Sequence, residues 1–365
     1  MSAGAAKLLA ARIRVLVVDD DPTYRRIVST ILGSMPEVEL VGTAATLALA
    51  RRCIEQGNVD AVTLDCVLRD ESGLDLLEWI RATHPKIVVI LLTAGQNKAA
   101  CRAVDALLLG ASGIVIKPSG RQAEQELKTA LQSALAAAAP QPLSSLPPLR
   151  SLPPGTPQGS RVHAQHRELI AVGASTGGPP VLLRFLRELP ASFDVPIVIT
   201  QHMHASHLGY FIDLLAAQSG RQVRPARHGE LVEPGQTYVA GRAAHLLVER
   251  VADQIVLLED DGPEEHNCKP SVDPMFRSVA RTCGEWSVGV VMTGMGSDGA
   301  LGAAAMRAIG APVVAQDQAT SVVWGMPGAT VALGAANKVV AGDALAQCVV
   351  QWTTGWKPPR RTNTR

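Results

Sequence analysis

Aromatic residues and long apolar runs are both scarce in this sequence. Phe, Trp and Tyr make up 3% of its 365 residues, which argues against the stacking surfaces that hold single-stranded nucleic acids. The longest purely aliphatic run, residues 87–92, is far shorter than the roughly 20 residues that cross a bilayer. Lys7 and Arg12 flank only a few small apolar residues, which does not match a signal peptide. We therefore expect no insertion into a membrane.

Cysteine is also sparse, and the charges are balanced. The six cysteines form no C-x-x-C motif and no close pair, which favours reduced thiols in a cytoplasmic protein. The chain carries 34 basic and 33 acidic residues, and from residue 161 onward the two signs are equal at 18 each. A DNA-binding output domain normally carries a basic surplus. The sequence therefore predicts a cytoplasmic protein with no nucleic-acid partner.

Proline, in contrast, is concentrated in one segment. Residues 140–160 hold seven of the 24 prolines in the chain. Proline at this density blocks helix formation and sheet pairing and favours extended chain. A loop of this length inside one domain would be unusual. We therefore predict a Pro-rich linker over 133–166 between two domains, at 12–132 and 167–353.

The first domain alternates short apolar runs with helical patterns, as buried parallel strands and their crossover helices do. Strands are predicted at 13–18, 38–41, 61–64, 87–92 and 113–116, and helices at about 22–33, 44–56, 73–83, 97–109 and 121–137. Five such units indicate a doubly wound α/β fold of the flavodoxin-like kind, with helices on both faces of a parallel sheet.

Polar residues stand at the ends of four predicted strands of this domain: Asp19, Asp20, Asp65, Thr93 and Lys117. Ligands bind at the carboxyl ends of strands in such sheets. Converging carboxylates suit a hard cation such as Mg²⁺, and a hydroxyl with an ammonium group can hold a phosphoryl group. A single Asp after a strand is more often a helix cap. Here all five polar residues are expected at the same edge of the sheet, which favours a binding site for a cation and a phosphoryl group. The next residue, Asp21, is the predicted N-cap of the first helix, with Pro22 at its first position.

The pattern of Asp19, Asp20, Asp65, Thr93 and Lys117 resembles that of the receiver domain of two-component response regulators. The resemblance implies that Asp65 is the phosphoacceptor, which takes its phosphoryl group from a histidine kinase. It also implies that Asp19 and Asp20, with Asp65, hold Mg²⁺, and that Thr93 and Lys117 coordinate the phosphate. The sequence departs from the receiver pattern at two points, with Arg69 in place of a usual proline and Ile114 in place of the usual aromatic switch residue.

The second domain opens with a short apolar strand that runs into a glycine-rich turn, residues 173–178. Such a turn can cradle a phosphate at a helix N-terminus, but its spacing fits neither G-x-G-x-x-G nor a P-loop. It does fit G-x-S-x-G, the nucleophile elbow, with Ser175 as the exposed hydroxyl. On the motif alone, a purely structural turn stays possible.

A serine nucleophile needs a base and an acid that orients the base. His202 follows the next predicted strand, and Asp298 lies in a glycine-rich loop after the apolar strand 288–292. Asp273 and Asp317 are rival acids. A metal site is a further alternative, because His202, His204 and His207 form an H-x-H-x-x-H cluster, although no cysteine or carboxylate completes it locally.

Five segments of this domain resemble the family of chemotaxis protein-glutamate methylesterases (CheB): LIAVGASTGGP, IVITQHM, HNCKPSVDPMF, VGVVMTGMGSDGA and VVWGMPGA. The resemblance implies a Rossmann-like serine esterase domain, with Ser175 as nucleophile, His202 as general base and Asp298 as the acid that orients it. Elbow geometry predicts the Thr176 N–H as an oxyanion donor, and the resemblance adds that of Met295. No cofactor is expected at this site.

The resemblance also implies the substrate and the regulation. The expected reactions are hydrolysis of γ-glutamyl methyl esters on methyl-accepting chemotaxis receptors and deamidation of receptor glutamines, both activated by phosphorylation. Two other classes of protein are alternatives to the esterase: a response regulator whose output domain only binds a ligand, and a DNA-binding regulator. The charge balance and the lack of a terminal helix-turn-helix pattern argue against the second.

Overall fold

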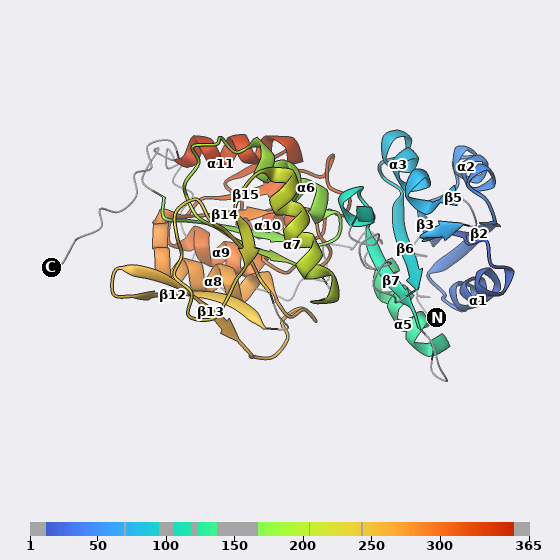
Figure 1. The fold of residues 1–365 in the computed structure, drawn as a ribbon, viewed down its shortest axis with the longest axis horizontal. Coiled ribbons are helices and arrows are strands. Elements are labelled where there is room, and N and C mark those ends of the chain that lie inside the picture. Colours follow the sequence, from blue (N-terminus) through green and yellow to red (C-terminus); the bar gives the residue numbers. More distant parts are fainter. Residues whose placement is uncertain are drawn as a thin grey trace, which may run out of the picture. The chain divides into compact units, whose positions relative to one another are not determined.

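The structure is a computed structural model of the 365-residue chain, and it describes residues 12–68, 71–94, 105–118, 123–136, 167–203, 205–241 and 244–353. The chain divides into two compact units, Met1–Ala139 and Pro140–Arg365. The first is coloured blue to teal in Figure 1 and the second green to red. The proline-rich segment 140–160 and most of the helix predicted at 97–109 lie outside the described residues.

The first unit contains a five-stranded parallel sheet in the order β2-β1-β3-β6-β7. Its strands are β1 (Ile13–Val18), β2 (Val38–Ala44), β3 (Ala61–Asp65), β6 (Val88–Ala94) and β7 (Gly113–Lys117), with a short hairpin of β4 (Val67–Leu68) and β5 (Glu71–Ser72). Its described helices are α1 (Pro22–Gly33), α2 (Leu47–Glu55), α3 (Gly73–Thr83) and α5 (Ala123–Ala136). This sheet confirms the doubly wound fold predicted for the first domain.

The alternation of side chains along β1 divides the core of this unit into two layers. Val15 and Val17 pack on one face with α1 and α5, whereas Leu16 and Val18 pack on the other with α2 and α3. Successive residues of a strand point to opposite faces, so a strand covered on both sides must be apolar throughout. The sheet is therefore closed to solvent on its faces, and its polar groups gather at the strand ends.

The second unit contains a seven-stranded parallel sheet in the order β10-β11-β9-β8-β14-β15-β16. Its strands are β8 (Leu169–Ala174), β9 (Ile197–Gln201), β10 (Val223–Pro225), β11 (Thr237–Val239), β14 (Ser287–Val291), β15 (Val313–Gln316) and β16 (Lys338–Val340). Its helices are α6 (Gly178–Glu188), α7 (Ala205–Ser219), α8 (Val272–Cys283), α9 (Ala300–Ala308), α10 (Met326–Ala332) and α11 (Leu345–Thr353). The prediction of two doubly wound parallel-sheet domains is thus confirmed.

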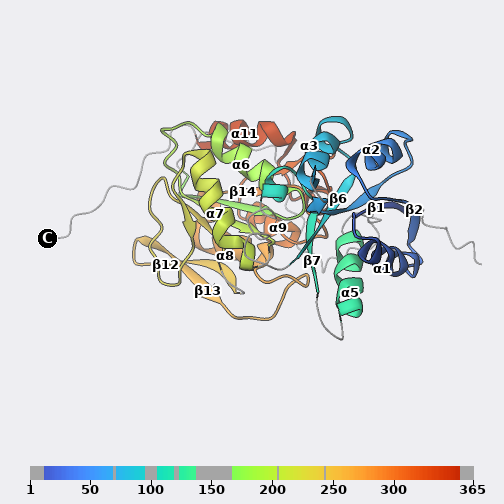
Figure 2. The ribbon, with the colours of Figure 1, turned by 45° about the vertical axis from the view of Figure 1, so that its right-hand side comes forward.

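The helices of this second unit fall into two groups. Helices α6, α7 and α11 pack against one another, and α8, α9 and α10 form a second packed group, as Figures 1 and 2 show. The strand order reverses at β8, which has β9 on one side and β14 on the other. In open α/β sheets such a reversal opens a crevice beyond the carboxyl ends of the strands. This crevice is where a site is expected.

A two-stranded antiparallel hairpin, β12 (His245–Val251) and β13 (Gln254–Asp260), packs against α8 outside the main sheet. It is the yellow and orange pair of arrows in Figure 1. This hairpin was not predicted from the sequence. The segment that follows the hairpin returns the chain to the N-terminus of α8, beside the crevice. Within the described residues, every helix is too short or too polar to span a membrane.

Candidate functional site

Three strands bring the predicted catalytic residues of the second unit to one edge. Ser175 follows the last residue of β8, and Ala174 in that strand is paired with Gln201 of β9, the residue before His202. The His202 N–H donates to the Ala174 carbonyl at 3.0 Å. On the other side of β8, the Ser175 N–H donates to the Thr293 carbonyl at 3.1 Å, just beyond β14. The ends of β8, β9 and β14 therefore converge on Ser175.

The turn at Ser175 has the strand–turn–helix context of a nucleophile elbow. Gly177 has φ +75°, a left-handed conformation that glycine adopts at little cost, and α6 begins at Gly178. A Cβ atom on Gly177 would lie 2.6 Å from Val322 Cβ, and one on Gly294 would lie 2.8 Å from Ser175 Cβ. The glycines around Ser175 are thus required by close packing on both sides of this residue.

His202 and Asp298 are in direct contact. His202 Nε2 donates to Asp298 Oδ2 at 2.8 Å, and the Asp298 side chain is 2% exposed. Asp298 also accepts hydrogen bonds from Ser271 Oγ at 2.7 Å and from the N–H groups of Val272 and Asp273, at 2.7 and 2.9 Å. The first N–H groups of α8 thus point at this carboxylate, where the helix dipole favours a negative charge.

These contacts set the charge of both groups. Burial alone would raise the pKa of Asp298, but the bonds from His202, Val272 and Ser271 outweigh it and lower that pKa to about 2. Burial alone would lower the pKa of His202, but Asp298 and the nearby Cys268 raise it to about 9. Asp298 therefore stays negative at neutral pH and stabilises a protonated imidazole, as an orienting acid must.

The second ring nitrogen of His202 faces away from Asp298. Nδ1 lies 3.6 Å from Cys268 Sγ, and within the described residues Ser175 Oγ makes no hydrogen bond to the imidazole. Because Nε2 is held by Asp298, Nδ1 is the nitrogen that can receive the serine proton. Catalytic hydrogen bonds are often long in a resting site and tighten when substrate binds.

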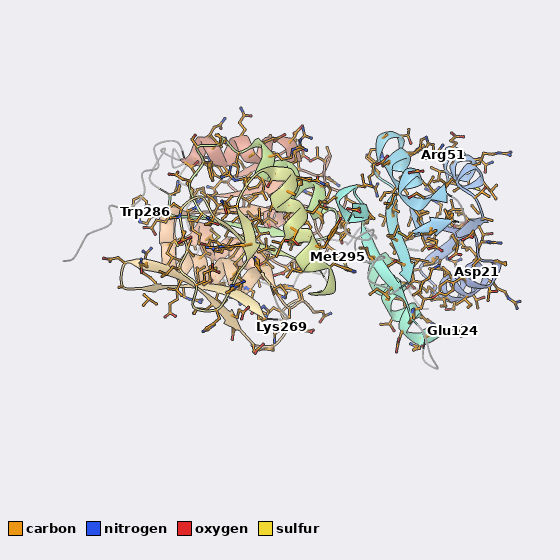
Figure 3. All side chains as sticks on the ribbon, in the orientation of Figure 1. Asp21, Arg51, Glu124, Lys269, Trp286 and Met295 are labelled. Atoms are coloured by element: carbon orange, nitrogen blue, oxygen red, sulfur yellow. The ribbon has the colours of Figure 1, made fainter. Side chains whose placement is uncertain are left out.

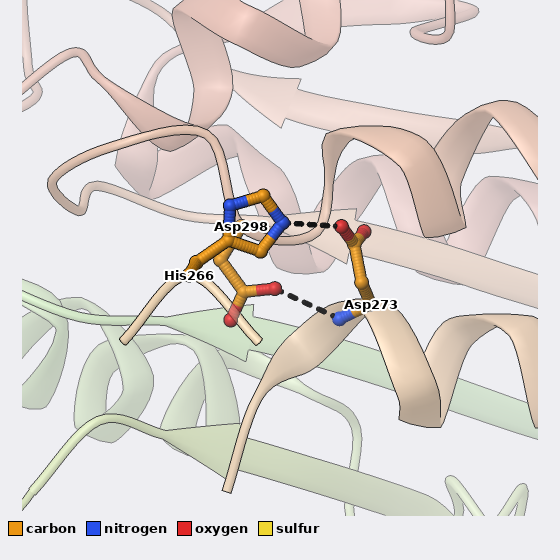
Figure 4. A group of neighbouring side chains, drawn as sticks. All are labelled: His266, Asp273 and Asp298. Carbon is orange, nitrogen blue, oxygen red and sulfur yellow. Dashed lines mark hydrogen bonds and ion pairs between the residues drawn. The ribbon is translucent and has the colours of Figure 1, made fainter. Parts of the chain in front are cut away.

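The rival acids have other partners. Asp273 accepts hydrogen bonds from His266 Nε2 at 2.8 Å and from the Gly302 N–H at 2.6 Å, and Asp317 accepts from Thr320. Figure 4 shows His266, Asp273 and Asp298 together, with the Asp273 N–H donating to Asp298. Asp298 is thus the acid that contacts His202, and Asp273 belongs to a second His–Asp pair beside it.

The metal alternatives find little support in the geometry. His204 of the H-x-H-x-x-H cluster lies outside the described residues, His207 is buried, and His202 is held by Asp298. Atoms of His266, Asp273 and Asp298 do lie within 4.8 Å of one another. The oxygens of Asp298, however, already accept five hydrogen bonds, and those of Asp273 accept two. This second group is therefore a hydrogen-bonded network in which His266 Nε2 already bonds Asp273 and the Asp298 oxygens already have five donors.

The two predicted oxyanion donors belong to the two loops that adjoin Ser175. Thr176 is in the turn after β8, and Met295, labelled in Figure 3, is in the loop after β14. Neither backbone N–H donates to any other described residue. The Thr176 carbonyl accepts from Thr293 Oγ1 at 3.0 Å, which ties the two loops together. Both N–H groups are therefore available to a ligand.

Sequence reasoning missed three residues that touch this site: Gln201, Cys268 and Ser271. Ser271 carried a usable signal, because a serine before an amphipathic helix is typical of an N-cap. In the structure its hydroxyl bonds Asp298 instead of capping α8. Gln201 and Cys268 gave no such signal, because their contacts with Ser175 and His202 arise from the fold of distant segments.

The first unit gathers its predicted site at the ends of β1, β3 and β7. Lys117 Nζ donates to Asp19 Oδ2 at 2.9 Å and to Asp65 Oδ2 at 2.7 Å. Asp19 is fully buried and Thr93 is 3% exposed. Burial would lower the pKa of Lys117, but Asp65 and Asp19 raise it above its ordinary value. The prediction for Asp21 is confirmed, because its side chain accepts from the N–H groups at the start of α1.

The acidic residues of this site fit a small divalent cation. One ligand atom each of Asp19, Asp20 and Asp65 lies within 4.8 Å of the others. Carboxylate oxygens are the ligands that Mg²⁺ takes in proteins. Helix α3 begins close to this site, because a Cβ on its first residue, Gly73, would overlap the Asp65 carbonyl oxygen.

Comparison with known proteins gives a consistent result for both units. The family model described as CheB methylesterase matches residues 170–349, and the response regulator receiver domain matches residues 15–132. A protein-glutamate methylesterase/protein-glutamine glutaminase of Trichodesmium erythraeum is 33% identical over 349 residues, which cover 93% of this chain and 99% of the relative. One from Caulobacter vibrioides is 38% identical over 342 residues, which cover 93% and 98%. Among solved structures, the Thermotoga maritima CheB methylesterase catalytic domain superposes with a TM-score of 0.50 at 30% identity, over 51% of this chain and 99% of that domain.

Proposed function

This chain belongs to the CheB methylesterase family, in the form that carries a response regulator receiver domain, and we propose from that membership how its two sites work. The second unit hydrolyses γ-glutamyl methyl esters on methyl-accepting chemotaxis receptors and deamidates receptor glutamines. The receiver accepts a phosphoryl group from a histidine kinase and thereby activates the esterase. The observation that carries the proposal is the His202–Asp298 pair at the strand edge that also presents Ser175.

The esterase reaction follows from the geometry in two halves. Ser175 Oγ attacks the ester carbonyl while His202 takes its proton, and the new oxyanion lies against the N–H groups of Thr176 and Met295. His202 then returns the proton to the leaving methoxide, so methanol departs and a glutamyl ester remains on Ser175. Water attacks this ester with His202 as base, which releases the glutamate side chain. With a glutamine substrate the leaving group is ammonia.

Asp298 contributes in two ways that its contacts support. Its hydrogen bond to Nε2 fixes the imidazole so that Nδ1, which contacts Cys268 in the resting site, is the nitrogen that takes the proton of Ser175. Its charge, held by the N-terminus of α8, stabilises the imidazolium that forms during each half of the reaction. Asp273, which bonds His266, has no such contact with the base.

In the receiver, Asp65 is the proposed phosphoacceptor. Asp19, Asp20 and Asp65 would hold Mg²⁺, which supplies positive charge to the transferring phosphoryl group. Thr93 and Lys117 would bind the phosphoryl oxygens once Asp65 is modified. Lys117 already bridges Asp19 and Asp65, so it lies close to the group that becomes charged.

The deciding experiment is methanol release from methylated receptor membranes, with and without a small phosphodonor. We expect release by the wild-type chain that increases with the phosphodonor. Ser175→Ala, His202→Ala and Asp298→Ala should each lose most of the activity while still folding. Because triad members act as a unit, the double variant Ser175→Ala/His202→Ala should lose little more than either single one.

Two results would contradict this assignment. Failure of a serine-directed reagent to label Ser175 would favour an output domain that only binds its ligand. Retention of near-wild-type turnover by Asp298→Ala, together with a loss in Asp273→Ala, would transfer the orienting role to Asp273.

A further inference from the structure

Gln201 is the last residue of β9 and lies between the nucleophile and the base. Its side chain is buried, with 3% of the residue exposed, and its backbone is paired with Ala174, the residue before Ser175. Nothing in the proposed reaction uses this amide. A buried polar side chain at such a place is expected to satisfy its hydrogen bonds or to have a role.

Both protons of the Gln201 amide are used on the catalytic residues. Nε2 donates to the Ser175 carbonyl at 3.0 Å and to the His202 carbonyl at 3.0 Å. The Ser175 carbonyl also accepts the Gly178 N–H at 2.8 Å, which closes the elbow turn. One amide group thus bridges the backbone of the nucleophile and the backbone of the base.

The bond to the Ser175 carbonyl has a consequence for the oxyanion site. The Ser175 carbonyl and the Thr176 N–H belong to the same planar peptide unit, and in a trans peptide they point in opposite directions. Donors that fix the carbonyl therefore fix the direction of the Thr176 N–H. Hydrogen bonds in a chain also polarise one another, so a donor on the carbonyl strengthens the N–H as a donor.

The amide oxygen of Gln201 accounts for Gly178, a glycine that is not part of the G-x-S-x-G motif. Gln201 Oε1 is buried and has no donor among the described residues. A Cβ on Gly178 would overlap this oxygen and would lie 2.8 Å from Ala174 Cβ. The chain thus accepts an unpaired buried carbonyl, with a glycine beside it, while both protons of the NH₂ group bond the backbone of Ser175 and His202.

We propose that Gln201 is a positioning residue of the esterase site, whose amide orients the Ser175–Thr176 peptide toward the oxyanion and holds it in register with His202. Glutamate has the same shape but no protons for the two carbonyl oxygens. Methionine has a similar length and no donor. Neither can replace the amide, so both should weaken transition-state binding more than substrate binding.

The test measures kinetics of the full-length chain with Gln201→Met and Gln201→Glu. Ser278→Ala is the matched control, because Ser278 also has one buried side-chain group in two hydrogen bonds, to the Val248 N–H and the Met275 carbonyl, away from Ser175. A fluorophosphonate counts the reactive Ser175 in each preparation, so that kcat is expressed per folded site.

For Gln201→Met we expect kcat per site to fall about 10- to 100-fold with KM changed less than about threefold, which is less than the loss from deleting an oxyanion donor outright. A trifluoromethyl ketone, to which Ser175 adds to form a tetrahedral oxyanion, should lose affinity in the same proportion. The kcat per site of Gln201→Glu should be lower than that of Gln201→Met. Should Gln201→Met yield no reactive sites, Gln201→Asn, which keeps the amide but is one methylene shorter, is expected to show the same loss confined to kcat.

Two results would overturn the positioning role. One is a kcat per site for Gln201→Met within threefold of that of Ser278→Ala, and the other is a change in KM with kcat unaffected. This role rests on the proposed esterase function, and the two can fail separately. A wild-type chain that is not labelled at Ser175 would defeat the function itself, whereas a labelled wild type with unchanged Gln201 variants would defeat only the role of Gln201.

Discussion

At the scale of single residues, the charge of His202 determines how the esterase should respond to pH. Burial lowers the pKa of its imidazole, but Asp298 and Cys268 raise it to about 9. A general base must be neutral to accept a proton, so the active fraction grows as pH rises toward that pKa. We expect kcat/KM to increase roughly tenfold per pH unit between pH 7 and 8, because below the pKa of His202 each unit of pH changes the neutral fraction of the imidazole about tenfold. A pH profile with a small ester substrate measures this.

Cys268→Ala provides the control for that profile. Cys268 contributes to the raised pKa of His202 through its contact with Nδ1 at 3.6 Å. Removing the thiol should move the rising limb of the profile to lower pH and increase the rate at pH 7 relative to its maximum. A limb that stays at the same pH in this variant would show that the thiol does not affect the base.

The phosphoacceptor gives a second prediction at this scale. Asp65 is expected to be the only residue that a small phosphodonor modifies, and the reaction should need Mg²⁺ because Asp19 and Asp20 add negative charge beside the incoming phosphate. Peptide mapping by mass spectrometry after incubation with the donor locates the label. Incorporation that persists in Asp65→Asn, or in the presence of a chelator, would contradict the assignment.

The sequence was sufficient to name Ser175, His202 and Asp298 as candidates, because each follows an apolar strand and parallel strands end at one edge. It could not identify Gln201 or Cys268. Their contacts join segments that the fold brings together, and neither residue type at its position predicts a partner. The residues alone left Asp273 as a rival of Asp298, and the family resemblance favoured Asp298. In the structure both carboxylates are buried, and their hydrogen bonds distinguish them, because Asp298 bonds His202 and Asp273 bonds His266.

At the scale of elements, the strands that were predicted well are those marked by a continuous apolar run. The buried strands β1 and β3 and the edge strand β7 all agree with the predicted ranges to within one residue. β2 runs to Ala44, three residues beyond the prediction, because it is an edge strand whose exposed positions interrupt the run. The β12–β13 hairpin was missed for a related reason, since only part of its length is buried against α8.

The join between β3 and α3 supports a prediction about one glycine. A Cβ on Gly73 would overlap the Asp65 carbonyl oxygen and lie 3.2 Å from the Cys66 carbonyl oxygen, both of which are backbone atoms that cannot rotate away. Gly73→Ala should therefore push α3 away from the end of β3, lower the thermal stability of the receiver by several degrees and slow the modification of Asp65. Thermal unfolding and the rate of labelling by a phosphodonor measure the two effects.

Gly113→Ala is the matched control in the same unit. Gly113 begins β7, and a Cβ there would meet nothing within 4 Å. This variant should keep both the stability and the labelling rate of the wild type. Equal behaviour of the two glycine variants would show that the contact at Gly73 does not limit the site.

At the scale of the whole molecule, each unit has a complete sheet and its own core, so each is built to fold by itself. The proposed phosphorylation site and the proposed esterase site lie in different units. Coupling between them must therefore act through an equilibrium between states of the whole chain. Phosphorylation can shift such an equilibrium only as far as it favours one state over the other.

The resemblance to CheB proteins implies that the unmodified receiver holds the esterase in a less active state, and removing the receiver tests this. Deletion of residues 1–160 leaves the strands from β8 to β16 intact. We expect this fragment to release methanol from receptor membranes faster than the unphosphorylated full-length chain and to ignore a phosphodonor, because the inhibited state no longer exists. Serine labelling counts its folded sites. A folded fragment no faster than the unphosphorylated chain would defeat inhibition as the mechanism, and Asp65 would then act by direct activation or by recruiting the esterase to its receptor.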